Sequence, residues 1–108
     1  MNQYLYRLEL TRPTLLLDGP TREEASALDE HAAYVERLTR ASTVLLAGRT
    51  QRPDDDAFGI VIFQAESDEA AQRVMQDDPA VQQGVMRAEL FPYRIAFLAD
   101  RIGELAAP

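Results

Sequence analysis

His31 is the side chain of this sequence best suited to acid–base chemistry, and it is the only histidine among the 108 residues. A histidine can accept or donate a proton near physiological pH without large tuning. His31 follows Leu28 by three residues and precedes Val35 by four, so in a helix it would lie on or beside the buried face. The alternative is a partly buried histidine without a function, whose ring hydrogen-bonds to a backbone carbonyl or to Asp18.

Arginine and tyrosine side chains could add binding groups to such a site. Arg12 and Arg49 each follow a predicted strand and could hold a carboxylate or a phenolate; the alternative is that they are solvated or paired with surface acids. Tyr6, Tyr34 and Tyr93 could line an aromatic pocket, or they could serve core and dimer packing. We take Arg12, Arg49 and Tyr93 as the candidate substrate-binding residues.

The sequence predicts neither a metal site nor a bound cofactor. It contains no cysteine, which excludes disulfides, thiolate nucleophiles and zinc–thiolate sites. The three adjacent aspartates at 54–56 lack the spacing of a calcium loop and have no partner histidine, so they predict a solvated turn. There is also no phosphate-binding glycine loop and no G-x-S-x-G nucleophile motif.

Composition narrows the classes of partner. A chain of 108 residues is expected to form one domain. Its net charge of −7, without a basic patch, argues against nucleic acid, whose binding depends on neutralising phosphates. No apolar run is long enough to span a membrane, and residues 1–10 alternate rather than form a signal peptide. We therefore expect a cytoplasmic protein without a nucleic-acid or membrane partner.

The first half of the chain predicts two strands around a long helix. Residues 2–10 alternate, with Tyr4, Tyr6, Leu8 and Leu10 on one face. After an apolar loop at 11–19, Thr21 and Glu24 form a capping box that begins a helix over 21–40. Its predicted apolar stripe is made of Ala25, Leu28, Ala32, Val35 and Leu38. A short apolar strand follows at 43–47, closed by Gly48.

The second half repeats this pattern after a polar loop at 49–56. A strand at 58–63 is apolar on both faces, so both faces should be covered. Ser67 caps a second helix that must end near Asp78, because Pro79 disfavours helical geometry in the residue before it. The remaining predictions are a helical turn at 79–83 ended by Gly84, a strand at 85–91, an extra edge strand at 93–98 and a poorly ordered tail at 99–108.

The resulting order, β-α-β-β-α-β, predicts a ferredoxin-like α+β domain over residues 1–98. In this arrangement two helices cover one face of an antiparallel sheet. The other face, which includes apolar residues of the strand at 58–63, then needs a different cover. A second copy of the chain, packed sheet against sheet about a two-fold axis, is the economical solution, so we expect a homodimer.

Five short motifs occur in an order that resembles the YciI-like (YCII-related) family of small proteins. They are D-E-H-A-A-Y-V-E-R-L, L-L-A-G, S-D-E-A-A, D-P-x-x-x-x-G and F-P-Y. The resemblance implies a dimeric α+β barrel of ferredoxin-like subunits. It also implies an active site centred on a histidine and an aspartate, which in this chain are His31 and Asp78.

Asp78 also has a purely structural interpretation. An aspartate before Pro79, followed by one turn and Gly84, is a good helix N-cap. In the functional interpretation, its carboxylate orients His31 and stabilises the imidazolium. The two roles are compatible, because a carboxylate has two oxygens. Asp77 is a competing candidate, and the D-P motif favours Asp78.

The chain departs from the family pattern at two places. Gly48-Arg49 stands where the family usually has Gly-Pro, and Ala41-Ser42 stands where the family often has a glycine. The first departure places a cation near the expected pocket rim, where it could favour anionic ligands or simply be solvated.

The resemblance implies a protein without an assigned reaction. One relative of the family is similar to enzymes that dechlorinate hydroxylated aromatics, and the wider barrel group includes isomerases and small monooxygenases. We therefore expect a small-molecule enzyme in which His31 and Asp78 transfer protons, of the isomerase, lyase or dehydrochlorinase type. The alternative is a small-molecule binding or accessory protein without turnover.

Overall fold

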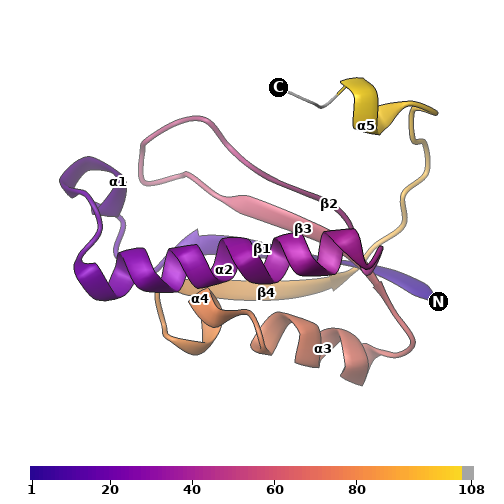
Figure 1. The fold of residues 1–108 in the computed structure, drawn as a ribbon, viewed down its shortest axis with the longest axis horizontal. Helices are drawn as coiled ribbons and strands as arrows, with labels where there is room; N and C mark the ends of the chain where they lie inside the picture. Colours follow the sequence, from indigo (N-terminus) through magenta and orange to yellow (C-terminus); the bar gives the residue numbers. More distant parts are fainter. Residues whose placement is uncertain (106–108) are drawn as a thin grey trace.

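A single four-stranded antiparallel sheet, with helices packed on one face, makes up the fold in the computed structural model, which describes residues 1–105 (Figure 1). The strands lie in the order β2-β3-β1-β4, which is the ferredoxin-like arrangement expected from the sequence. The elements are β1 (Asn2–Leu10), α1 (Leu15–Asp18), α2 (Arg22–Arg40), β2 (Val44–Arg49), β3 (Gly59–Ala65), α3 (Asp68–Gln76), α4 (Pro79–Gln82), β4 (Met86–Pro92) and α5 (Ile102–Leu105).

The central strand β1 supplies the middle of the core. The predicted alternation is confirmed, because Tyr4, Tyr6 and Leu8 are buried on the face that the helices cover. Phe63 of β3 lies between the two tyrosines, with ring centroids 5.7 Å from Tyr4 and 5.6 Å from Tyr6. Aromatic rings at such offset or edge-on geometries add specific packing to the burial of apolar area.

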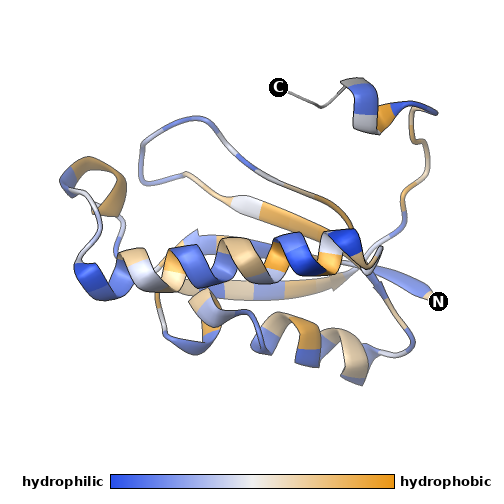
Figure 2. Cartoon of the chain, in the orientation of Figure 1, coloured by the Kyte–Doolittle hydropathy of each residue, from blue (hydrophilic) through white to orange (hydrophobic). Residues whose placement is uncertain are grey.

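Helix α2 begins at the predicted capping box. The Glu24 amide donates to Thr21 Oγ1 at 3.1 Å, and the Thr21 amide donates to Glu24 Oε1 at 2.8 Å. Polar and apolar bands alternate along the helix in Figure 2, as an amphipathic helix requires. The buried line differs from the predicted stripe: Ala27 and Tyr34 are buried and Ala32 is exposed. Ala27, His31 and Tyr34 are four and three residues apart, so His31 lies between two buried side chains.

Two local predictions were wrong. Leu15–Asp18, within the predicted loop, forms the short helix α1, and Leu15 packs with Ala27 and Val85. Residues 93–98 form no strand, because β1 begins at Asn2 and already pairs with β4 at Tyr4↔Pro92, so little partner strand remains. In the predicted poorly ordered tail at 99–108, helix α5 forms at Ile102–Leu105, and residues 106–108 lie outside the described residues.

The sheet face opposite the helices carries an apolar row that crosses all four strands. Strand register aligns Leu46 of β2, Ile62 of β3, Leu5 of β1 and Phe91 of β4. Helices α2, α3 and α4 pack on the other face, with Tyr4 and Tyr6 (Figure 1). In residues 1–105 no helix combines the length and the hydropathy that crossing a membrane would take.

Candidate functional site

His31 and Asp78, which are 47 positions apart, are in direct contact. Nδ1 of His31 lies 2.8 Å from both Oδ1 and Oδ2 of Asp78. His31 comes from the middle of α2, and Asp78 is the N-cap of α4. The contact is shielded from water, since the Asp78 side chain is 0% exposed and the His31 side chain is 19% exposed.

The Asp78 carboxylate serves the helix cap and the histidine at the same time. Its Oδ1 accepts a hydrogen bond of 3.0 Å from the Ala80 amide in the first turn of α4, where Pro79 occupies the first position. Its Oδ2 accepts a hydrogen bond of 2.8 Å from the Tyr6 hydroxyl. A buried carboxylate is costly unless donors surround it, and here three different donor groups do so.

Tyr6 is a part of this site that the sequence analysis did not identify. The sequence predicts only a pocket-lining or packing role for Tyr6, whereas its hydroxyl reaches the Asp78 carboxylate from the central strand β1. Burial, together with the negative charge of Asp78, raises the pKa of the Tyr6 phenol far above its ordinary value. The phenol therefore stays protonated and remains a donor. The feature of the sequence that could have identified Tyr6 is its position on the predicted buried face, because a buried tyrosine hydroxyl needs a hydrogen-bond partner.

Tyr34 joins α2 to α3 next to the same site. Its hydroxyl donates to the Val74 carbonyl at 2.7 Å. Burial, with smaller contributions from the charges of Asp77 and Asp78, raises the pKa of Tyr34 to about 12. Tyr34 is therefore a neutral structural donor, and the cavity-lining residues do not include it.

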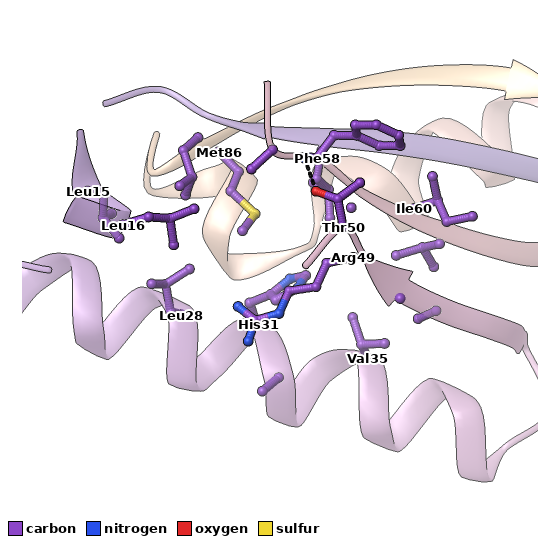
Figure 3. A pocket seen from close by; sticks show the side chains of 18 of the residues that line it. Leu15, Leu16, Leu28, His31, Val35, Arg49, Thr50, Phe58, Ile60 and Met86 are labelled. Carbon is purple, nitrogen blue, oxygen red and sulfur yellow. Dashed lines mark hydrogen bonds between the residues drawn. The ribbon is translucent and has the colours of Figure 1, made fainter. Parts of the chain in front are cut away.

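A cavity of about 530 Å³ opens beside His31, between α2, the sheet, α1 and the loop that connects β2 to β3 (Figure 3). Because Nδ1 faces the buried Asp78, the ring edge that carries Nε2 is left for the cavity. Most of the wall is apolar. The lining includes Leu8, Leu10, Leu15, Leu16, Leu28, Val35, Phe58, Ile60, Val61 and Met86.

The three candidate substrate-binding residues lie in different places. Arg49 lines the cavity. Arg12 does not, because its guanidinium donates to both carboxylate oxygens of Glu24 at 3.0 and 2.7 Å and to Asp18 at 3.1 Å. Tyr93 is 44% exposed and borders a separate hollow beside Tyr4, away from the residues that line the His31 cavity.

The Arg12–Glu24 pair fastens the segment after β1 to the beginning of α2. The Arg12 guanidinium and the Thr21 amide lower the pKa of Glu24 to about 2. The hydrogen bond and charge of Glu24 in turn raise the pKa of Arg12. Asp18 is held in the same cluster, and the ring of His31 contacts Asp78 instead, so Asp18 as the hydrogen-bond partner of His31 was wrong.

The aspartates at 54–56 lie in a turn. Oδ1 of Asp54 accepts a hydrogen bond from the Asp56 amide at 3.1 Å, and Oδ2 pairs with Arg52 at 2.8 Å. Over residues 1–105, no group of three His, Asp or Glu side chains is arranged as a metal site would require.

Two solved enzyme structures share this fold. The 5-chloro-2-hydroxyhydroquinone dehydrochlorinase TftG from Burkholderia phenoliruptrix AC1100, in complex with 2,5-dihydroxybenzoquinone, is 19% identical with a TM-score of 0.59, over 84% of this chain and 93% of that chain. Muconolactone isomerase is 16% identical with a TM-score of 0.64, over 92% of this chain and 99% of that chain. At these identities the likeness shows a common fold.

Sequence comparison finds a matching family but no matching curated protein. No curated protein sequence matches this chain significantly. The YCII-related domain, in contrast, matches residues 6–94, which include the second half of β1, helices α2 and α3, and both His31 and Asp78. The chain is therefore a member of the YCII-related domain family.

Proposed function

We propose that this protein is an enzyme that transfers a proton on a small molecule bound in the His31 cavity. His31 is the general acid–base, and Asp78 is the residue that orients it. The observation that carries this proposal is the 2.8 Å contact between His31 Nδ1 and the fully buried Asp78, at the wall of a largely apolar cavity. Acid–base groups of this kind contribute about 10²–10⁴-fold to a rate.

The geometry supports a defined role for each ring nitrogen. A hydrogen on Nδ1 that is donated to Asp78 leaves Nε2 with a lone pair towards the cavity. When Nε2 takes up a substrate proton, the carboxylate stabilises the resulting imidazolium. Tyr6 and the Ala80 amide hold that carboxylate in place before any substrate arrives. The site is thus preorganised to transfer one proton at Nε2 of His31.

The residues of the chain favour proton transfer over covalent catalysis. The sequence contains no cysteine and no lysine, so it has no side chain that could attack as a thiolate or form a Schiff base. His31 could take a proton from one carbon and return it to another, which is an isomerisation. It could also take a proton while a leaving group departs from the neighbouring carbon, which is an elimination. The names of the two enzymes that share the fold, a dehydrochlorinase and an isomerase, describe reactions of these kinds.

Hydrogen–deuterium exchange on carbon tests the proposal without knowledge of the natural substrate. A panel of small cyclic ketones and lactones would be incubated with the protein in D₂O, and loss of carbon-bound protons would be followed by ¹H NMR. We expect protein-dependent exchange that falls at least about a hundredfold in His31→Gln. The exposed neighbour Asp77 offers a matched control, since Asp77→Asn should leave exchange unchanged. Exchange that survives in a folded His31→Gln variant would contradict the assignment.

A second candidate is a small-molecule binding or accessory protein without turnover. The observation in its favour is that Asp78 already caps α4 and satisfies buried Tyr6, so folding alone can account for the carboxylate. This candidate predicts ligand binding in the cavity with no exchange on any bound molecule. It also predicts that His31→Gln changes affinity without changing chemistry.

We further propose that the protein acts as a homodimer that pairs the sheet faces. The apolar row Leu46, Ile62, Leu5 and Phe91 faces away from the helices. Phe91 is 37% exposed in the single chain. Burying such a row against a second copy about a two-fold axis would remove apolar surface from water on both sides.

A further inference from the structure

We propose that the His31 cavity selects a ring-bearing molecule with one negative charge, a carboxylate or a phenolate, whose charge is held by Arg49 and Thr50. This inference rests on the proposed function, because it names the class of substrate for the same cavity. It concerns recognition, however, and can be measured without any turnover.

The charged cavity-lining residue that is free to contact a ligand is the positively charged Arg49, as a comparison with Glu36 shows. Besides His31, the titratable residues of the lining are Glu36 and Arg49. Glu36 pairs with Arg40 at 2.7 Å, and its side chain is 64% exposed, so it is directed to the surface. Arg49 has no side-chain hydrogen bond or ion pair to any of residues 1–105. In Figure 3 its side chain extends from the end of β2 over the cavity, in the direction of α2.

Thr50, the next residue, adds a second donor at the same rim. Its Oγ1 accepts a hydrogen bond of 3.1 Å from the Phe58 amide, which is the dashed contact in Figure 3. Because that oxygen acts as an acceptor there, the hydroxyl hydrogen remains to be donated. The guanidinium of Arg49 and the hydroxyl of Thr50 both present donors, and the anionic oxygen of a carboxylate or a phenolate can accept from them.

The remainder of the cavity suits the body of such a ligand. Most of the other lining side chains are apolar, including Leu28, Val35 and Met86. A volume of about 530 Å³ lies within the range of about 300–1,000 Å³ that small-molecule sites occupy. An apolar ring would therefore displace water from the leucine wall, while its single charge stays at the polar rim.

Because the protein is negatively charged overall, any preference of the cavity for anions should depend on Arg49. The chain carries a net charge of −7, which repels anions at long range. An anion can therefore prefer this cavity over its neutral counterpart only through local donors. Arg49 is the arginine among the lining residues, so the preference should depend on this one side chain.

The test compares benzoate with its neutral analogue benzamide. Each would be titrated into the protein, and binding followed through the NMR signals of His31 and of the Leu28 and Val35 methyl groups. We expect benzoate to bind about tenfold or more tightly than benzamide, as a charge-assisted pair would give. Arg49→Gln should abolish that preference by weakening benzoate alone, and Arg49→Lys should restore part of it. The matched control is Arg52→Gln, because Arg52 is paired with Asp54 and lies outside the cavity lining.

Two results would overturn the inference. One is equal binding of benzoate and benzamide, or a preference that survives Arg49→Gln. The other is the absence of binding by both probes at tens of millimolar. His31→Gln separates this inference from the proposed function, because it should retain the preference for benzoate while losing proton exchange. A charge preference without any exchange would contradict the proposed function alone, and exchange without a charge preference would contradict this inference alone.

Discussion

The Nδ1 atom of His31 lies 2.8 Å from both carboxylate oxygens of Asp78, and the same carboxylate begins helix α4. Fold and candidate chemistry therefore share one buried group. The Ala80 amide and the Tyr6 hydroxyl complete its surroundings. Any change at Asp78 should consequently be visible both in stability and in the state of the histidine ring.

Replacing Asp78 with asparagine should destabilise the fold by about 2–3 kcal/mol. The side-chain amide of asparagine would point N–H hydrogens at groups that themselves donate, whereas the carboxylate accepts from all of them. At least one buried hydrogen bond is therefore lost or inverted. Urea denaturation measures the change, with Asp77→Asn as the exposed control expected within about 0.5 kcal/mol of wild type. Equal, small effects of the two substitutions would show that the Asp78 contacts contribute little.

Tyr6→Phe should cost about 1.5–3 kcal/mol, the usual range for a hydrogen bond to a charged group. The matched comparison is Tyr34→Phe, which removes a bond of 2.7 Å to a neutral carbonyl and should cost about 0.5–1.5 kcal/mol. Both variants would be compared with wild type by urea denaturation. A greater loss for Tyr34→Phe than for Tyr6→Phe would contradict the importance assigned to the Tyr6–Asp78 bond.

The neutral His31 ring should carry its hydrogen on Nδ1. Asp78 can only accept when ionised, so the nitrogen that faces it must donate. Two-dimensional ¹H–¹⁵N NMR at about pH 9 distinguishes the two tautomers, and a single histidine removes the need for assignment in an untagged protein. Asp78→Ala provides the comparison, because without the acceptor the other tautomer should gain population. A hydrogen on Nε2 in the wild type would contradict the proposed direction of proton transfer.

The contribution of Glu24 to stability should disappear in acid. Its pKa is lowered from an ordinary value of 4.5 to about 2 in the folded protein, chiefly by the Arg12 guanidinium. A lowered pKa of an acid means that the stabilisation is fully present above 4.5 and is lost as the pH falls towards 2. Glu24→Gln keeps the capping-box geometry and removes the charge.

The measurement is the difference in unfolding free energy between wild type and Glu24→Gln at several pH values. This difference should be greatest near neutral pH and should shrink below 4.5. Glu23→Gln, an exposed first-turn neighbour, should show no comparable trend. A pH-independent difference would mean that the Arg12–Glu24 pair does not stabilise the fold through its charge.

Phe91→Arg should convert the proposed dimer into a monomer. The substitution places a charge in the apolar row that register aligns with Leu5 and Ile62, where a paired sheet would have to desolvate it. Light scattering after size-exclusion chromatography gives the mass directly. Ala33→Arg, on the exposed side of α2, is the control and should keep the wild-type mass. A wild-type protein that is already monomeric at high concentration would contradict the sheet-face dimer.

Local patterns in the sequence were sufficient for the architecture. Alternation in β1 identified the face that carries Tyr4 and Tyr6, because successive side chains of a strand point to opposite sides. The capping box at Thr21 and Glu24 located the beginning of α2, since its two hydrogen bonds join residues only three apart. Helical spacing placed His31 near the buried face. The order of the elements then indicated the ferredoxin-like sheet.

The composition of the site depended on contacts between distant segments. His31 meets Asp78 only because α2 and the cap of α4 lie on the same sheet face, and Tyr6 joins them only because β1 is the central strand. Arg12 was expected near a ligand, but the fold brings Glu24 within reach and occupies its guanidinium. Residue types, periodicity and the family resemblance thus indicated which side chains could act, whereas the packing of α2, α4 and β1 decided which of them meet, because no local pattern encodes contacts across 47 or 72 positions.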